Sequence, residues 1–247
     1  MPGTLYLVPV PLSDGDPGEV LPDPVLQRVR SLQYLLAENA RSARAFLKAA
    51  GHPGPIQQVR IVEIGKAPTA IQADQWLAPL SAGDTDAALI SECGCPGIAD
   101  PGAAIVARAH AGGLKVRPLV GPSSLWLALM ASGMNGQHFR FLGYLPQDGD
   151  ALAQRLRQVE SDAGRGETQM FIETPYRTER LFQSILAHCA LATRLCLAID
   201  LGAPAETILS MPVGEWRRLP LQRRPDLKRR PAVFLIHGAP AAGSARQ

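Results

Sequence analysis

The sequence predicts an α/β protein of two domains, with a parallel sheet in the first domain and a mixed sheet in the second. Up to about residue 135, short apolar segments alternate with longer helical patterns, which is typical of a largely parallel sheet. After residue 136 the strand-like segments have few helices between them, which indicates a mixed sheet. The 247 residues, 46% of them hydrophobic, are enough for two cores. We therefore expect domains at 1–135 and 136–238, followed by a loose tail at 239–247.

The first domain is expected to alternate strands and helices. Segments that are short, apolar and rich in β-branched residues predict buried strands at 4–10, 32–37, 60–64, 87–90 and 115–120. Apolar residues at helical spacing and glycine stop signals predict helices at 23–30, 41–50, 69–80 and 102–111. A further helix is expected to begin at Gly121-Pro122-Ser123-Ser124.

The second domain is expected to be richer in strands. These are predicted at 139–145, 169–173, 194–199, 207–211 and 232–236, with helices around 152–159 and at 176–189. Between Arg217 and Arg230 stand seven basic residues and one acid, Asp226. Such a run is typical of a solvated hairpin, and it could also hold phosphates.

Composition excludes several classes of protein. The hydrophobic content excludes a wholly disordered chain, and the many glycines (23) and prolines (22) predict sharp loops. Aromatic residues make up only 5%, which argues against a surface built to stack unpaired bases. The net charge of +3 permits a nucleic-acid partner without requiring one.

Neither a targeting segment nor a metal site is expected. The first four residues lack the charged and apolar regions of a signal peptide. The longest apolar run, 125–131, is far shorter than the ~20 residues of a membrane helix. The histidines are scattered, and no C-x-x-C pair occurs among the four cysteines, Cys93, Cys95, Cys189 and Cys196. We expect a cytoplasmic protein with reduced thiols, no membrane contact and no metal.

Three loops follow predicted strands of the parallel sheet: the segment after Val10, the loop 92–102 and Gly121-Pro122-Ser123-Ser124. The carboxyl ends of parallel strands meet at one sheet edge, where α/β proteins bind ligands. Glycines in 92–102 allow a ligand to approach closely, and prolines fix the shape of the loop. Its spacing is not G-x-G-x-x-G and no lysine follows, which disfavours a dinucleotide or a triphosphate. The alternative is a structural turn, with Asp100 and Ser123 as helix caps.

Two acidic residues also end predicted strands. Glu38 is well placed for acid–base or substrate-orienting work, or it is a loop charge paired with Arg41. Glu173-Thr174-Pro175-Tyr176-Arg177 repeats this arrangement in the second half.

Taken together, these motifs resemble the S-adenosylmethionine-dependent methyltransferases of the tetrapyrrole methylase fold (class III). Among them, the chain is most similar to the family that methylates the ribose 2′-oxygen of a cytidine in bacterial 16S ribosomal RNA. The resemblance covers nearly the whole chain, from Gly3 to Gly238. It rests on six motifs in family order: Gly3 to Val8 with Pro11, Ala37-Glu38, Gly94 to Gly102, Val120 to Ser123, Gly143 to Pro146, and Glu173 to Arg177.

The resemblance implies two α/β domains with the methyl donor bound between them, in a homodimer. Glu38 and Arg41 are the implied catalytic residues, which orient or deprotonate the acceptor hydroxyl. Arg177, Arg223 and Arg224 are expected to bind the acceptor, and the expected partner is ribosomal RNA or the small ribosomal subunit. The residues expected to bind S-adenosylmethionine are Pro11, Cys93, Gly94, Cys95, Ile98, Ser123, Ser124, Glu173 and Gly202.

The chain departs from the family pattern at several positions. After the second strand the family reads A-E-D-T-R, where this chain has Ala37-Glu38-Asn39-Ala40-Arg41. The segment 200–206 lacks the lysine of the family's E-L-T-K-x-x-E, and Asp148 replaces a lysine after G-F-L-P. The loss of two cations should weaken phosphate contacts. We therefore expect a retained donor site and a changed acceptor site, as in a divergent paralogue.

Three functions follow from these observations. A methyltransferase acting on ribosomal RNA is the favoured one. The second keeps the fold and methylates a tetrapyrrole or another small molecule. The third, motivated by the altered Asn39-Ala40 pair, is a non-catalytic protein that binds S-adenosylmethionine.

Overall fold

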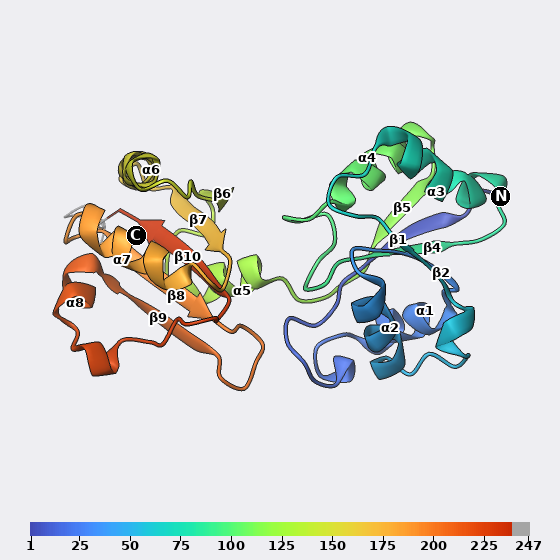
Figure 1. Cartoon of the computed structure of the whole chain (residues 1–247), viewed down its shortest axis with the longest axis horizontal. Helices are drawn as coiled ribbons and strands as arrows, with labels where there is room; N and C mark the ends of the chain where they lie inside the picture. Colours follow the sequence, from blue (N-terminus) through green and yellow to red (C-terminus); the bar gives the residue numbers. More distant parts are fainter. Residues whose placement is uncertain (239–247) are drawn as a thin grey trace. The chain divides into compact units, whose positions relative to one another are not determined.

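The computed structural model describes residues 1–238, and the tail predicted at 239–247 lies outside the described residues. The chain forms two compact units, Met1–Ser123 and a second that begins at Ser124 (Figure 1). The sequence pattern places this boundary near residue 135. In the structure it falls earlier because helix α5 (Ser124–Ser132) packs on strands of the second sheet, with Ala128 and Leu129 buried.

The first unit is built on a five-stranded parallel sheet, as the sequence predicts. Its strands lie in the order β3-β2-β4-β1-β5, and all neighbouring pairs are parallel. They are β1 (Thr4–Val8), β2 (Tyr34–Ala37), β3 (Arg60–Glu63), β4 (Ala87–Ile90) and β5 (Lys115–Pro118). Every residue of the inner strands β2 and β4 is buried, which explains their continuous apolar sequences.

Helices cover both faces of this sheet and build two separate cores. Tyr6 and Val8 of β1 belong to the core with the first two helices, whereas Leu5 belongs to the core with the next two. Successive residues of a strand point to opposite faces, so β1 contributes to both cores. The helices are α1 (Asp23–Ser31), α2 (Ala40–Ala49), α3 (Ala70–Ala82) and α4 (Gly102–Ala111), with 3₁₀ turns at Pro17–Glu19 and Ile56–Gln58.

The second unit is built on a five-stranded sheet in the order β6-β7-β10-β8-β9. β6 pairs with β7 in parallel and the other neighbours are antiparallel, which confirms the predicted mixed sheet. In its core, Phe171 and Phe234 stack with ring centroids 5.6 Å apart. The strands are β6 (Phe139–Tyr144), β7 (Thr168–Glu173), β8 (Arg194–Ile199), β9 (Thr207–Pro212) and β10 (Ala232–His237), and two helices are α6 (Gly149–Ala163) and α7 (Thr178–His188).

Helix α8 (Val213–Arg218) is absent from the sequence-based prediction. It has only six residues, too few to show helical periodicity, and it is held by the fully buried Trp216. The predicted hairpin at 217–230 is wrong, because this fully described segment holds the end of α8, a 3₁₀ turn at Leu221–Arg223 and an irregular loop, without a strand. Of the helices in the described chain, none has the length and apolar character needed to cross a membrane.

Candidate functional site

Three loops at one edge of the first sheet form the candidate site. They follow β1, β4 and β5, and so leave the carboxyl ends of parallel strands. Two backbone hydrogen bonds between Val10 and Gly94, with N···O distances of 2.9 and 3.2 Å, join the first two loops. The loop after β5 packs closely at Gly121, where an added Cβ would lie 2.2 Å from Pro9 Cγ. The structure therefore brings the three predicted ligand loops together.

The loop after β4 is fixed in a strained shape. Gly94 and Gly97 have φ angles of 70° and 82°, and Ala99 has a φ of 60°, which is unfavourable for a residue with a Cβ. Asp100 stabilises this shape, because its Oδ1 accepts hydrogen bonds from the N–H groups of Gly97 and Gly102, both at 2.7 Å. Burial raises the pKa of Asp100 in spite of these two bonds, and its Oδ2 has no partner within the described residues. A positive φ at a residue with a Cβ, as at Ala99, is common at ligand sites.

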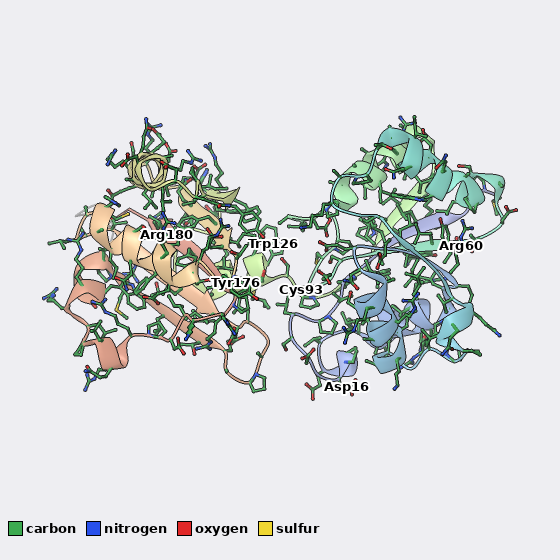
Figure 2. The ribbon with its side chains drawn as sticks, in the orientation of Figure 1. Asp16, Arg60, Cys93, Trp126, Tyr176 and Arg180 are labelled. Carbon is green, nitrogen blue, oxygen red and sulfur yellow. The ribbon has the colours of Figure 1, made fainter. Side chains whose placement is uncertain are left out.

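Cys93, which is labelled in Figure 2, and Cys95 lie in the loop after β4, and their thiols approach backbone carbonyl oxygens. The Sγ of Cys93 lies 3.6 Å from the carbonyl oxygen of Leu12, and the Sγ of Cys95 lies 3.3 Å from that of Pro122. Burial raises the pKa of both thiols, so they stay protonated at neutral pH. Their backbone N–H groups have no acceptor within residues 1–238. No group of three metal-binding side chains occurs in this described part of the chain.

A cavity of about 530 Å³ opens beside these loops, in the size range of small-molecule sites. Its walls come from the loop after β1, from α2 and from the end of β4, so it lies within the first unit. Pro11 and Phe46 give it apolar surface, and Ser42, Asp14 and Glu92 give it polar groups. The lining holds two carboxylates and no lysine or arginine, which suits a neutral or positively charged group and disfavours a phosphate.

Glu38 follows β2 and is tied to the wall of this cavity. Its Oε2 accepts a hydrogen bond from the N–H of Glu92 at 3.3 Å. Burial raises the pKa of Glu38; the hydrogen bond from Glu92 opposes this, and the charges of Glu92 and Asp100 add to it. A raised pKa makes the ionised carboxylate a stronger base. Arg41 is exposed, and no ion pair joins it to Glu38 among the described residues, so the predicted alternative of a paired loop charge is wrong.

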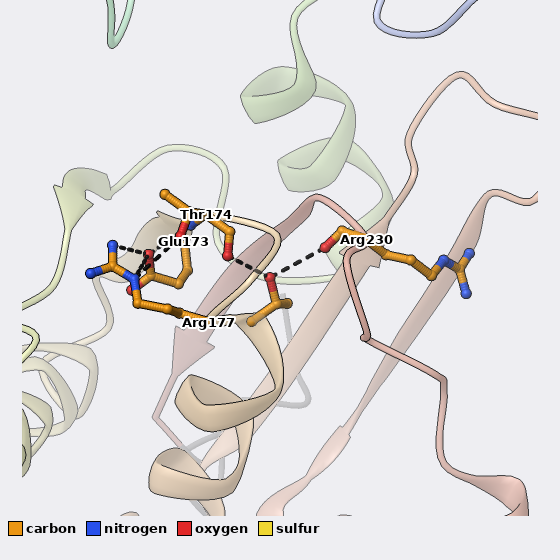
Figure 3. A network of polar contacts seen from close by, with 5 residues as sticks. Glu173, Thr174, Arg177 and Arg230 are labelled. Atoms are coloured by element: carbon orange, nitrogen blue, oxygen red, sulfur yellow. Dashed lines mark hydrogen bonds and ion pairs between the residues drawn. The ribbon is translucent and has the colours of Figure 1, made fainter.

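In the second unit, a predicted donor-binding residue and a predicted acceptor-binding residue bond to each other. Glu173 Oε1 accepts hydrogen bonds from Arg177 Nε at 3.0 Å and Nη2 at 2.6 Å, and from the N–H of Thr174 at 2.6 Å (Figure 3). The Glu173 side chain is only 6% exposed, so the ion pair neutralises a largely buried carboxylate. Both side chains are therefore engaged in holding the turn between β7 and α7.

The loop after β8 resembles the loop after β4 in its strain. Asp200 has a φ of 48° and Gly202 a φ of 77°. Glu206 closes the loop, because its Oε2 accepts the N–H of Gly202 at 2.9 Å. Asp200 Oδ2 accepts a hydrogen bond from Arg230 Nε at 2.6 Å, which links this loop to the basic run.

The other predicted residues differ in their environment. Ser123 is buried in the loop after β5, Ser124 begins α5, and Ile98 is exposed. Arg224 donates hydrogen bonds to the carbonyl oxygens of Leu219 and Arg217, at 3.1 and 3.2 Å. Arg223 is exposed, and its side chain has no hydrogen-bond partner among the described residues.

Sequence reasoning missed the cavity residues Asp14, Ser42 and Phe46. Ser42 and Phe46 are four residues apart on α2, and this spacing places them on one face of the helix. That spacing, next to Glu38 and Arg41, is the signal that could have identified them. Asp14 lies in the loop after β1, where nothing local distinguishes it from a turn residue.

Comparison with known proteins identifies the family. A protein of Neisseria meningitidis named ribosomal RNA small subunit methyltransferase I is 30% identical over 216 residues, which cover 86% of this chain and 69% of the relative. The chain belongs to the ribosomal RNA small subunit methyltransferase I family. The Xylella fastidiosa member is 29% identical over 95% of this chain and 81% of its own length. The Vibrio cholerae member is 34% identical over 63% of this chain, and the match spans about half (53%) of that relative.

Solved structures share the fold. The methyltransferase CobJ matches over 97% of this chain and 95% of its own, with a TM-score of 0.61 and 16% identity. Uroporphyrin-III C-methyltransferase from Thermus thermophilus matches over 96% of this chain and 93% of its own, with a TM-score of 0.53 and 20% identity. These similarities confirm the predicted tetrapyrrole methylase fold. No family profile matches the chain.

The departures from the ribosomal RNA small subunit methyltransferase I pattern have structural explanations. Asn39 caps α2, because its Oδ1 accepts the N–H groups of Arg41 and Ser42 at 2.8 and 3.2 Å. Asparagine caps a helix as well as the family's aspartate does. Asp148 caps α6 in the same way, through two N–H groups of its first turn. Both residues therefore stabilise helices of the family fold.

Proposed function

We propose that this chain transfers a methyl group from S-adenosylmethionine to ribosomal RNA of the small ribosomal subunit, at a ribose 2′-oxygen. The observation that carries the proposal is the position of Glu38, a carboxylate with a raised pKa. Glu38 bonds to the wall of a cavity whose described lining has no lysine or arginine. The strained loop after β4, with free N–H groups at Cys93 and Cys95, leads out of the same sheet edge. Family membership supports the acceptor, since the relatives are named for ribosomal RNA of the small subunit.

The loops of the first unit fit the donor. Free N–H groups at Cys93 and Cys95 suit its carboxylate or its adenosine. Gly94 has a φ of 70°, which favours glycine, and an added Cβ would lie 3.2 Å from Leu12 Cδ2, so a side chain there would crowd the loop after β1. When bound, S-adenosylmethionine supplies an activated methyl group on a positively charged sulfur. The remaining expected contacts are Pro11, Ile98, Ser123, Ser124, Glu173 and Gly202.

Glu38 and Arg41 are assigned to the acceptor. Ionised Glu38 accepts the proton of the ribose hydroxyl while the methyl group passes from sulfur to oxygen, the carbon–sulfur bond breaking to leave S-adenosylhomocysteine. Its raised pKa strengthens Glu38 for this task. Arg41, exposed and without an ion-pair partner among the described residues, orients the acceptor through a phosphate. The cavity receives the nucleoside, because its wall combines Phe46 with polar groups and excludes the charge of a phosphate. Positioning and desolvation of the two reactants then provide most of the catalysis.

Two observations weigh against the alternatives. A tetrapyrrole with acidic side chains would need cations, whereas the cavity is lined by two carboxylates and no lysine or arginine. The altered Asn39 motivates a non-catalytic protein, but Asn39 keeps its helix-capping role. The homodimer implied by the resemblance and the cytoplasmic location expected from the sequence stay predictions. Light scattering of the purified protein and cell fractionation test them.

The donor site is tested first, by calorimetric titration with S-adenosylmethionine and S-adenosylhomocysteine. We expect saturable binding near one site per chain, and no binding of NAD as the control ligand. A folded protein that binds neither compound would overturn the proposal.

The acceptor is tested by incubating the protein with small ribosomal subunits and methyl-labelled donor. We expect label in a 2′-O-methylnucleoside after digestion of the RNA. Glu38→Gln is expected to lower kcat by about 10²- to 10⁴-fold with unchanged donor affinity. Glu19→Gln, at an exposed glutamate without a side-chain hydrogen bond among the described residues, is the matched control. Label found only on a porphyrinoid, or on no acceptor, contradicts the proposal.

A further inference from the structure

Tyr176 is the most exposed aromatic side chain in residues 1–238, with 81% of its surface accessible. It lies in the turn 174–177, between β7 and α7 (Figure 2). The low aromatic content argues against an extended stacking surface, but one ring is enough to stack one base. Neither the donor site nor the expected acceptor residues explain why this ring is kept in water.

The turn that carries Tyr176 is fixed to a second segment. Its ends are joined by a hydrogen bond from the N–H of Arg177 to the carbonyl oxygen of Thr174 at 2.9 Å. The hydroxyl of Thr178 shares its proton between the carbonyl oxygens of Thr174 and Arg230, at 3.1 and 3.2 Å (Figure 3). The ring therefore stands on a backbone that is tied to the basic run.

Arg229 is placed beside this ring by the same network. Its guanidinium carbon lies 5.9 Å from the centroid of the Tyr176 ring, within the range of a cation–π contact. The φ of Arg229 is 58°, which is unfavourable for a residue with a Cβ. Arg230 holds this conformation, because its guanidinium donates hydrogen bonds to Asp200 Oδ2 at 2.6 Å, Ala205 O at 2.8 Å and Asp226 O at 3.2 Å. The structure thus fixes a strained arginine next to an exposed ring.

We propose that Tyr176 and Arg229 form a binding site for unpaired RNA. The ring stacks on one base, and the guanidinium contacts a phosphate next to that base. The exposed Lys228 extends the positive charge along the same loop. An RNA strand fits this surface better than a protein does, since the run 217–230 has seven basic residues and one acid and every base offers a face for stacking. The inference rests on the proposed ribosomal RNA acceptor and adds residues outside the ion pair of Arg177.

The test is the affinity of the full chain for a fluorescein-labelled single-stranded RNA, with and without one 2-aminopurine. Tyr176→Ala is expected to lower the affinity by about 5- to 100-fold and to abolish the quenching of 2-aminopurine, whereas Tyr176→Phe retains both. Arg229→Ala is expected to reduce the slope of log affinity against log salt by about 0.7. Tyr144→Ala, at another exposed tyrosine, and Arg157→Ala, at an exposed arginine of α6, are the matched controls. Unchanged melting temperatures confirm that each variant is folded.

Several results would overturn the site. One is wild-type RNA binding that Tyr176→Ala leaves unchanged, or that Tyr144→Ala weakens equally. Another is a loss seen with intact small subunits but not with protein-free RNA, which would assign Tyr176 to a ribosomal protein. Methylation of small subunits is measured in parallel. Normal methylation with unchanged RNA affinity in Tyr176→Ala rejects the stacking site alone. Tyr176-dependent RNA binding without methylation rejects the proposed activity alone.

Discussion

The cavity of the first unit and the loops of the second unit differ in how their charged side chains are paired. Around the cavity of the first unit, Asp14, Glu92 and Glu38 have no basic partner within hydrogen-bond distance among the described residues. Around the loops of the second unit, Arg177 and Arg230 are both in ion pairs with largely buried carboxylates. The first arrangement leaves carboxylates available to a ligand, whereas the second uses most of its charge to hold loops.

This difference separates side chains suited to catalysis from side chains that hold loops or bind RNA. A carboxylate that is partly desolvated and unpaired is a better base, and it destabilises the fold that holds it. A guanidinium bonded to carbonyl and carboxylate oxygens stabilises a loop but has fewer donors left for a phosphate. Within the described run 217–230, the basic side chains without such bonds are Arg223, Lys228 and Arg229, and these are free to meet RNA.

The largest expected effect is on kcat and concerns Glu38, the carboxylate beside the cavity of the first unit. Ionised Glu38 is the form that accepts a proton, so kcat is expected to fall as the pH drops through its raised pKa. Glu38→Gln is expected to lower kcat by about 10²- to 10⁴-fold and to abolish its fall at low pH, which is the acidic limb of the pH profile. The measurement is kcat against pH, from about pH 4 to pH 8. An acidic limb that persists in Glu38→Gln would assign the titration to another group.

The stability of the same variant tests whether burial of the Glu38 carboxylate is unfavourable. Because the pKa of Glu38 is raised on folding, the folded protein binds more protons than the unfolded chain between the two pKa values. Stability contributed by this group is complete below the unfolded pKa and is lost as the pH rises through the folded pKa. At neutral pH, Glu38→Gln is therefore expected to be at least as stable as the wild type in urea. A clear loss of stability would show that the carboxylate is favourable in the fold.

The next effect is on the loops that hold the first site. Gly121→Ala places a Cβ 2.2 Å from Pro9 Cγ and 2.5 Å from Pro9 Cβ, so a loop must move. We expect a loss of about 1–3 kcal/mol in the free energy of unfolding, with weaker donor binding. Gly149→Ala is the matched control, since it begins α6 and a Cβ there meets nothing within 4 Å. Urea denaturation of both variants decides the matter, and equal effects would contradict the close packing of the three loops.

The fourth prediction tests whether the arginines of the second unit stabilise its loops. Arg230→Ala removes three hydrogen bonds of a largely buried guanidinium and is expected to cost about 1–3 kcal/mol. Arg229→Ala removes only an exposed side chain, and its effect is expected to stay within about 0.5 kcal/mol. Urea denaturation compares the two neighbours. Equal losses would mean that the network around Arg230 contributes little.

Sequence reasoning succeeded where the determinants are local. The strands β2 and β4 are buried on both faces, so their apolar runs identify them without further information. The helix caps at Asn39 and Asp148 are also local. Compared with the family pattern, however, these two positions suggested that binding residues had been lost. Read as residues that precede helices, both are ordinary caps.

Sequence reasoning failed where partners are distant in the chain. Glu38 meets Glu92 across 54 residues, and Thr178 meets Arg230 across 52. No periodicity or motif encodes such a contact, because it depends on how the loops pack after the sheet has formed. For the same reason the sequence assigned one role to Arg177, Arg223 and Arg224, whose side chains have three different environments.

The smallest expected effects separate Arg223 from Arg224. Arg224→Ala removes hydrogen bonds to two backbone carbonyls and is expected to cost about 1 kcal/mol of stability, with little change in RNA affinity. Arg223→Ala is expected to leave stability within about 0.5 kcal/mol and to reduce the salt slope of RNA binding by about 0.7. Urea denaturation and RNA titrations at several salt concentrations measure both quantities for both variants. If Arg224→Ala lowers the salt slope as much as Arg223→Ala does, arginines that hold the loops also contact phosphates. The second unit would then not divide its arginines into some that bind RNA and others that stabilise loops.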